Sequence, residues 1–168
     1  MEIVIPQHEI QKRVEELALE ISADHRKSKN ALPPVMICIL NGSYMFYTDL
    51  LRYMNIDVQS DFIRIKSYEG QDNSGGCKII KGLEVDLKGR NVYIVDDICD
   101  TGATIIEAIS MANEHIPNDV KVVTLARRGG AKNLTNFCGF ILGEEWIVGY
   151  GLDDNGIRRN LEDIYKIN

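Results

Sequence analysis

The spacing of apolar residues divides the chain into alternating helices and strands. Over residues 8–22, apolar side chains recur every three or four positions, which predicts an amphipathic helix with its charged face in solvent. These apolar residues are Ile10, Val14, Leu17 and Ile21. The pair Pro33-Pro34 interrupts any helix. The wholly apolar run at residues 35–40 that follows is typical of a strand covered on both faces.

The same alternation continues toward the C-terminus. Helical spacing returns over residues 44–54 and 104–115, and strands are predicted over residues 58–65, 91–95, 120–126, 137–142 and 146–150. This order predicts one α/β domain spanning residues 1–168, with a mainly parallel sheet flanked by helices. Ligands of such sheets bind at the carboxyl ends of the strands, so residues that follow the apolar runs are the first functional candidates.

Charge and composition narrow the classes of function. The net charge of −6 argues against a nucleic-acid binder, so an anionic substrate would need backbone amides, a few arginines or metal ions. The four cysteines are widely separated and form no C-x-x-C pair, which argues against a zinc site. The N-terminus lacks the pattern of a signal peptide, and no apolar run approaches the ~18 residues of a membrane span. We therefore expect a cytoplasmic protein that binds neither nucleic acid nor membrane.

An acidic turn follows the apolar run at residues 91–95. Asp96, Asp97 and Asp100 place three carboxylates within five positions, although a helix cap needs only one. Because like charges repel, these side chains are expected to face cations, hydroxyls or a proton in transfer. The next four residues offer hydroxyls and consecutive backbone N–H groups at a helix start, which is an arrangement that binds anions. They are Thr101, Gly102, Ala103 and Thr104. A sugar phosphate requires this combination; the alternative is an ordinary capped strand-turn-helix.

The run VYIVDDICDTGAT at residues 92–104 resembles the motif with which type I phosphoribosyltransferases bind phosphoribosyl pyrophosphate (PRPP). The resemblance implies that Asp96 and Asp97 bind the ribose hydroxyls, directly or through Mg²⁺. It implies that residues 100–104 hold the 5′-phosphate and that Asp100 accepts a proton from purine N7. It also implies the type I phosphoribosyltransferase fold, with a small hood formed by the terminal segments.

Two further segments resemble the hypoxanthine-guanine branch of this family. Leu40-Asn41-Gly42-Ser43 is similar to its pyrophosphate loop, which implies that Asn41 and Gly42 bind pyrophosphate; the alternative is a simple Asn-Gly turn. Ser67-Tyr68, followed by a polar, glycine-rich run, is similar to its flexible catalytic loop. That similarity implies a lid that excludes water from the reactive ribosyl carbon, whereas the alternative is a plain connection.

A third segment, WIVGYGLD at residues 146–153, resembles the purine-binding part of the same branch. The resemblance implies that Trp146 stacks on the purine and that the Ile147 backbone hydrogen-bonds the edge of the base. Asp153 would lie beside a second Mg²⁺, and Arg159, six residues later, would contact pyrophosphate. Without this context, Trp146 would be read as a core or interface aromatic.

One position departs from the pattern of that branch. Arg127 stands where the branch has a lysine that donates to the purine 6-oxo group, with Lys132 as the second choice and a purely surface role for Arg127 as the alternative. The planar guanidinium of arginine reaches farther than the lysine ammonium and directs its N–H groups differently. The preference among hypoxanthine, guanine and xanthine is therefore left open.

The resemblance as a whole implies a glycosyltransferase of purine salvage that forms homo-oligomers, either dimers or tetramers. Such an enzyme transfers 5-phosphoribosyl from PRPP to N9 of a 6-oxopurine and releases pyrophosphate. Two other functions stay open: another PRPP-dependent transferase, such as one for orotate or adenine, and a non-catalytic regulator that senses PRPP or nucleotides. The segment at residues 146–153 argues against both.

Overall fold

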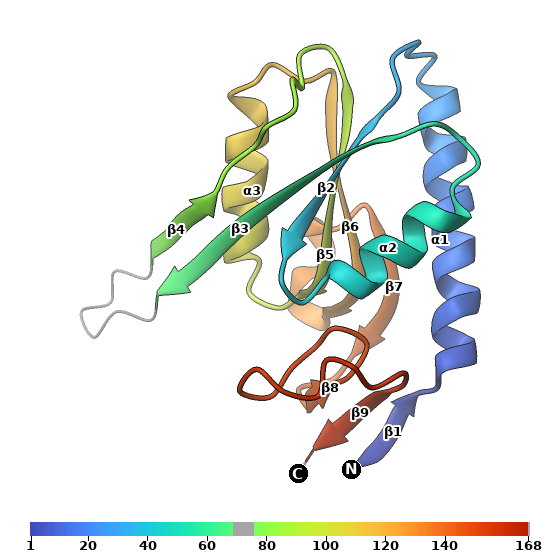
Figure 1. Ribbon diagram of the computed structural model, residues 1–168, viewed down its shortest axis with the longest axis vertical. Coiled ribbons are helices and arrows are strands. Elements are labelled where there is room, and N and C mark those ends of the chain that lie inside the picture. The colour runs from blue at the N-terminus through green and yellow to red at the C-terminus, as the bar shows by residue number, and fades with distance from the viewer. Residues whose placement is uncertain (69–75, 168) are drawn as a thin grey trace.

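The computed structural model describes residues 1–68 and 76–167. Its body is a six-stranded sheet with the strand order β4-β3-β2-β5-β6-β7 (Figure 1). The strands are β2 (Val35–Leu40), β3 (Gln59–Tyr68), β4 (Gly76–Lys81), β5 (Asn91–Cys99), β6 (Asp119–Arg128) and β7 (Phe137–Leu142). Strands β3, β2, β5, β6 and β7 are parallel, and β4 pairs antiparallel with β3 at the edge. The predicted α/β class with a mainly parallel sheet is confirmed.

The two ends of the chain form the predicted hood. Strands β1 (Glu2–Ile5), β9 (Ile164–Ile167) and β8 (Trp146–Val148) make an antiparallel sheet in the order β1-β9-β8. Figure 1 shows this small sheet beyond the carboxyl ends of the parallel strands, with both termini in it. A long loop between β8 and β9 completes the hood. The carboxyl ends of the parallel strands, where ligands are expected to bind, therefore face the hood.

Helices cover both faces of the main sheet. Helices α1 (Gln7–Lys27) and α2 (Tyr44–Tyr53) pack on one face, where their apolar residues join side chains of β2, β5, β6 and the hood in one core cluster. Helix α3 (Ala103–Asn113) packs on the other face against β2, β3 and β5. Arg13 on α1 also holds the edge strand β7, because its guanidinium donates to the carbonyl oxygens of Gly139 and Cys138.

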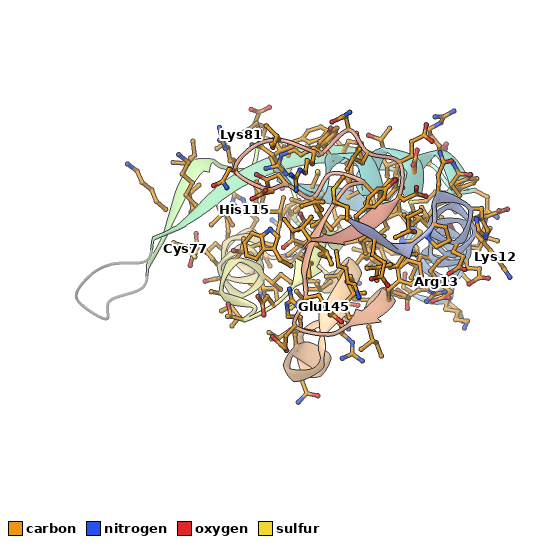
Figure 2. All side chains as sticks on the ribbon, turned by 90° about the horizontal axis from the view of Figure 1, so that it is seen from below. Lys12, Arg13, Cys77, Lys81, His115 and Glu145 are labelled. Carbon is orange, nitrogen blue, oxygen red and sulfur yellow. The ribbon has the colours of Figure 1, made fainter. Side chains whose placement is uncertain are left out.

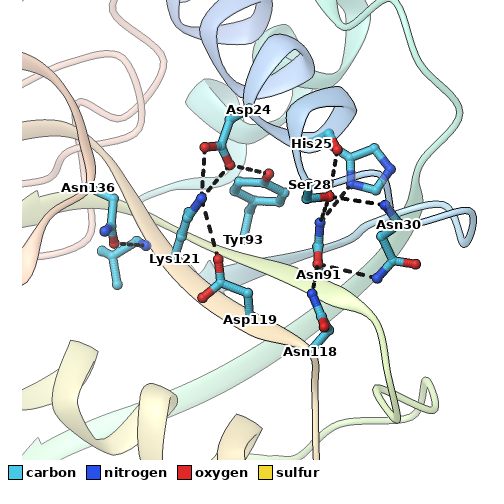
Figure 3. A network of polar contacts seen from close by, with 11 residues as sticks. Asp24, His25, Ser28, Asn30, Asn91, Tyr93, Asn118, Asp119, Lys121 and Asn136 are labelled. Atoms are coloured by element: carbon cyan, nitrogen blue, oxygen red, sulfur yellow. Dashed lines mark hydrogen bonds and ion pairs between the residues drawn. The ribbon is translucent and has the colours of Figure 1, made fainter.

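The first helix is longer than its apolar period predicts. Its last turn is anchored by polar contacts at the end of the sheet away from the hood (Figure 3). The Asp24 carboxylate accepts hydrogen bonds from the Tyr93 hydroxyl and the Lys121 ammonium, each at 2.7 Å. His25 is buried, and its Nδ1 lies 3.1 Å from the Asn91 side-chain amide. Polar contacts of Asp24 and His25 thus stabilise the last turn of α1, which lies beyond the apolar residues that predicted the helix.

Three strands were missed from the sequence, namely β1, β4 and β9. Two of them have only four residues, too few to display a period, and they pair with each other across nearly the whole chain. Strand β5 is also longer than expected, so that Asp96 and Asp97 lie within the strand and not in a turn. The strands predicted over residues 35–40 and 137–142 coincide with β2 and β7, and the other predicted helices and strands are present with shifted ends. Within the described part of the chain, no helix has the length and apolar character needed to span a membrane.

Candidate active site

Three adjoining cavities open at the carboxyl end of β5. The nest cavity, of about 90 Å³, is lined by Asp96 and the residues from Ile98 to Ile105. The acidic cavity, of about 470 Å³, lies between β5, the end of β2 and the hood. The tryptophan cavity, of about 220 Å³, lies against β8. Ile98 lines all three, so a ligand with three chemical parts can occupy them together.

The nest cavity is formed by the start of α3. Gly102 is the residue before the helix and has φ of 83°, a left-handed conformation that glycine adopts without strain. Gly102 has no side chain to cap the helix, and the Ala103 N–H makes only a long contact of 3.5 Å with the Thr101 hydroxyl. The first N–H groups of α3 and the Thr101 and Thr104 hydroxyls are therefore available to an anion in the cavity. The cavity lies at residues 100–104, where the sequence predicts an anion site, and that role stays a prediction.

The acid pair lies between the cavities: Asp96 lines the nest cavity and the acidic cavity, and Asp97 lines the acidic cavity and the tryptophan cavity. Asp96 is buried, and its Oδ1 accepts a hydrogen bond of 3.0 Å from the Asp97 backbone N–H. Asp97 Oδ1 accepts one of 2.7 Å from the backbone N–H of Ile98. Burial, reinforced by the adjacent Asp97 charge, raises the pKa of Asp96 well above its ordinary range, and burial also raises the pKa of Asp97. Two such carboxylates are suited to a ligand that brings cations or hydroxyls.

The Asn41-Gly42 loop lies directly against this pair. Both residues line the acidic cavity, and a β-carbon on Gly42 would lie 1.6 Å from Asp97 Oδ2. From the other side, a β-carbon on Gly151 in the hood would lie 2.1 Å from the Gly42 carbonyl oxygen. Glycine at both positions lets the loop after β2, the end of β5 and the hood meet in one place.

The cations of the acidic cavity come from the hood and from β3. Arg159 Nη2 lies 2.6 Å from Asp153 Oδ1, and Nη1 donates to the Gly151 carbonyl oxygen at 2.5 Å. Arg159 and Asp153 both line the cavity, as expected from the sequence. Lys66, near the end of β3, lines it as well, and the sequence analysis passed over it. Its position at the carboxyl end of a parallel strand was the signal that could have found it.

The carboxylates of the acidic cavity suit Mg²⁺. Asp96, Asp97 and Asp153 line this cavity, but the described residues contain no group of three His, Cys, Asp or Glu side chains already arranged around a metal ion. Mg²⁺ usually retains several waters and is bound by one or two carboxylates together with substrate phosphates. An all-oxygen donor set beside a phosphate-sized cavity fits that mode.

The tryptophan cavity has an aromatic wall and a cationic wall. Trp146 lines it with 61% of its surface exposed, and Ile147 lies beside it. On the other side, Arg128 donates to the carbonyl oxygens of Glu145, at 3.1 Å, and of Gly143. Figure 2 labels Glu145 on the face of the molecule that carries the hood. The Trp146 ring is therefore available to a planar ligand.

Asp100 lies where the tryptophan and nest cavities meet. Its side chain is 63% exposed and lines both cavities. Arg128 Nε lies 3.5 Å from Asp100 Oδ2, which places a cation next to this carboxylate. Asp100 can thus reach a planar ligand on one side while the anion site holds the rest of the molecule on the other.

The structure corrects the position of the cation expected at Arg127. Among the described residues Arg128, and not Arg127, lines the tryptophan cavity. Neighbouring residues of a strand point to opposite faces, so Arg127 points away from the cavity that Arg128 lines. The cation beside Trp146 is thus Arg128, the neighbour of the predicted Arg127, and the role of either arginine toward a purine stays a proposal.

The predicted lid falls largely outside the described residues. The backbone of Ser67 and Tyr68 belongs to the end of β3 and pairs with Cys77 and Gly76. Their side chains, the side chain of Lys132 and the whole of residues 69–75 lie beyond the description. The lid therefore stays a prediction.

The chain is similar to known proteins of one family. Residues 4–155 match the family model described as the phosphoribosyl transferase domain. The chain is 37% identical over 163 residues to the hypoxanthine-guanine-xanthine phosphoribosyltransferase of Tritrichomonas foetus, covering 95% of this chain and 87% of the relative. It is 33% identical over 171 residues to the hypoxanthine phosphoribosyltransferase of Buchnera aphidicola subsp. Schizaphis graminum, covering 99% and 96%. A crystal structure of a hypoxanthine-guanine phosphoribosyltransferase from Bacillus anthracis superposes with a TM-score of 0.91 at 33% identity, covering 100% of this chain and 99% of that chain.

Proposed function

This chain belongs to the phosphoribosyltransferase family, and from that premise we propose how its residues carry out the reaction. The enzyme acts in purine salvage, where it transfers the phosphoribosyl group of PRPP to hypoxanthine or guanine. The observation that carries the proposed arrangement is the junction of the three cavities at Ile98. The 5′-phosphate occupies the nest cavity, the diphosphate occupies the acidic cavity, and the purine occupies the tryptophan cavity. The ribose lies between them, beside Asp96 and Asp97.

The diphosphate leaves from the acidic cavity. The bond from the anomeric carbon to the diphosphate oxygen breaks while purine N9 forms its bond to the same carbon. Arg159, Lys66 and the backbone of the Asn41-Gly42 loop stabilise the negative charge that the leaving diphosphate carries. Mg²⁺, when bound by Asp96, Asp97 and Asp153, supplies further neutralisation of that charge. The buried Asp96 and the neighbouring Asp97 favour the positive charge that develops on the ribosyl centre.

The purine is held between Trp146 and Arg128. Trp146 stacks on the ring, and the Ile147 backbone binds its edge. Each terminal nitrogen of Arg128 has two N–H groups and uses one on a backbone carbonyl, which leaves donors for the 6-oxo oxygen. A 6-amino group offers no acceptor there, so adenine is selected against. Asp100, between the two cavities, accepts the proton that the base loses at N7.

Steady-state kinetics with PRPP and a panel of bases test this proposal. We expect activity with hypoxanthine and guanine, little with adenine, and loss of activity when EDTA removes divalent ions. Efficient use of adenine or orotate alone would refute the 6-oxopurine assignment, and PRPP binding without turnover would favour a regulator. The range of bases, including xanthine, is read from the same panel.

Two neighbouring arginines provide a matched pair of variants. Arg128→Ala is expected to raise KM for hypoxanthine, whereas Arg127→Ala, on the opposite face of β6, leaves it unchanged. The reverse result would return the donor role to Arg127.

We further propose that the enzyme works in the cytoplasm as a homo-oligomer. That proposal is supported by its family membership, and sedimentation would test the oligomeric state.

A further inference from the structure

Thr124 on β6 has a buried hydroxyl with no partner. Its side chain is fully buried, and among the described residues its Oγ1 is the one buried side-chain nitrogen or oxygen without a hydrogen bond. A buried hydroxyl left unpaired destabilises a protein, because it has lost its bonds to water and gained none in return. We therefore looked for an acceptor to which this hydroxyl can donate when substrate is bound.

The strand register places the carboxylate of Asp96 beside Thr124. Thr124 is paired with Asp96 in the parallel register of β5 and β6. Paired residues on adjacent strands, which lie ~4.8 Å apart, project their side chains to the same face. The preceding pair, Ile94 and Val122, points to the face covered by α3, since both belong to the core clusters there. Thr124 and Asp96 therefore point side by side toward that same face.

Asp96 can gain a second hydrogen bond without losing its first. Its Oδ1 already accepts from the Asp97 backbone N–H, while the carboxylate lines both the nest cavity and the acidic cavity. Thr124 does not line either of these cavities. It can therefore act on a bound substrate only through its neighbour.

We propose that Thr124 is a positioning residue for Asp96. When the ribose of PRPP draws the Asp96 carboxylate toward its hydroxyls, the Thr124 hydroxyl donates to that carboxylate and fixes its orientation. The inference rests on the proposed role of Asp96 in holding the ribose. It adds a residue that touches neither PRPP nor the purine but sets how tightly PRPP is bound.

Replacing the hydroxyl by a methyl group separates this role from a structural one. Thr124→Val keeps the shape and the β-branched side chain, and Thr124→Ser keeps the hydroxyl. A hydrogen bond to a charged group contributes enough to change binding about tenfold or more. We expect Thr124→Val to raise KM for PRPP about tenfold, to leave KM for hypoxanthine unchanged, and to melt at the same temperature as the parent or higher. Thr124→Ser should restore KM for PRPP.

If the Thr124 hydroxyl only stabilises the fold, the variants should behave differently. Thr124→Val would then melt at a lower temperature with KM for PRPP within twofold of the parent, and this result would overturn the inference. Thr124→Ala is measured alongside, so that poor folding of one variant leaves the comparison intact.

Asp96→Asn distinguishes the inference from the proposed function. If Asp96→Asn binds PRPP as the parent does, the role of Asp96 is wrong and the role of Thr124 fails with it. If Asp96→Asn raises KM for PRPP and Thr124→Val does not, only the inference fails. If both raise it, the double variant should be no worse than Asp96→Asn alone, because the hydroxyl acts through that carboxylate.

Discussion

A single methyl group on Gly42 should displace Asp97 and disable the site while leaving the fold intact. The added β-carbon of Gly42→Ala would lie 1.6 Å from Asp97 Oδ2 and 2.7 Å from its Cγ. These atoms normally rest ~3.5 Å or more apart, so the carboxylate must move by about 2 Å. Gly42 has no positive φ, so alanine fits the backbone, and the strain falls on the Asp97 side chain. A strained side-chain rotamer costs about 0.5–1.5 kcal/mol.

The displacement should affect catalysis far more than stability. A catalytic group misplaced by ~1 Å can lower the rate about 100-fold, so we expect kcat/KM for PRPP to fall by roughly that factor or more. The strain on Asp97 corresponds to a fall in melting temperature of no more than about 6 °C for a chain of this size. Initial rates over a range of PRPP concentrations at saturating hypoxanthine, with thermal unfolding of the same preparations, measure both effects.

Two comparisons make the prediction refutable. Gly82→Ala is the matched control, because a β-carbon there has no atom of the described residues within 4 Å, and it should retain parental kinetics. Gly42→Ala with kcat/KM within threefold of the parent would refute the argument. If the methyl group acts through Asp97, adding it to Asp97→Ala should cost little more. Full additivity would mean that it obstructs the diphosphate directly.

Three further changes have expected outcomes. Trp146→Ala should raise KM for hypoxanthine about 10-fold or more without changing stability, because stacking contributes ~1–3 kcal/mol per base and the side chain is largely exposed; equal KM values would exclude stacking. Tyr150→Phe removes the 2.7 Å hydrogen bond to the Asp49 carboxylate that joins the hood to α2, and urea unfolding should show a loss of roughly 1.5–3 kcal/mol; a loss under about 0.5 kcal/mol would contradict this. Burial lowers the pKa of His25, so the unfolded chain binds a proton more readily and stability should decrease as pH falls below about 6.5. His25→Gln should flatten the dependence of unfolding midpoints between pH 7.5 and 5.5, and an unchanged slope would assign it to other groups.

The main sheet and the chemistry of its loops follow from local patterns. Apolar periodicity indicates helix or strand within ten or so residues, and it predicted the parallel strands and the three helices. The acidic run from Asp96 to Thr104 is contiguous, so one segment of sequence contains both the acid pair and the anion site. Neither inference requires knowing which strands are neighbours.

Strand pairing and side-chain direction decided the rest. Whether Arg127 or Arg128 faces the purine depends on which face each residue takes next to β7, because a shift of one residue turns a side chain to the opposite face. Lys66 belongs to the acidic cavity because β3 lies beside β2, and Thr124 meets Asp96 through the register of β5 and β6. The sequence by itself thus determined which chemical groups the protein has and on which elements they lie. The tertiary structure decided which of them meet, because contacts between distant segments depend on pairing and packing that no local pattern records.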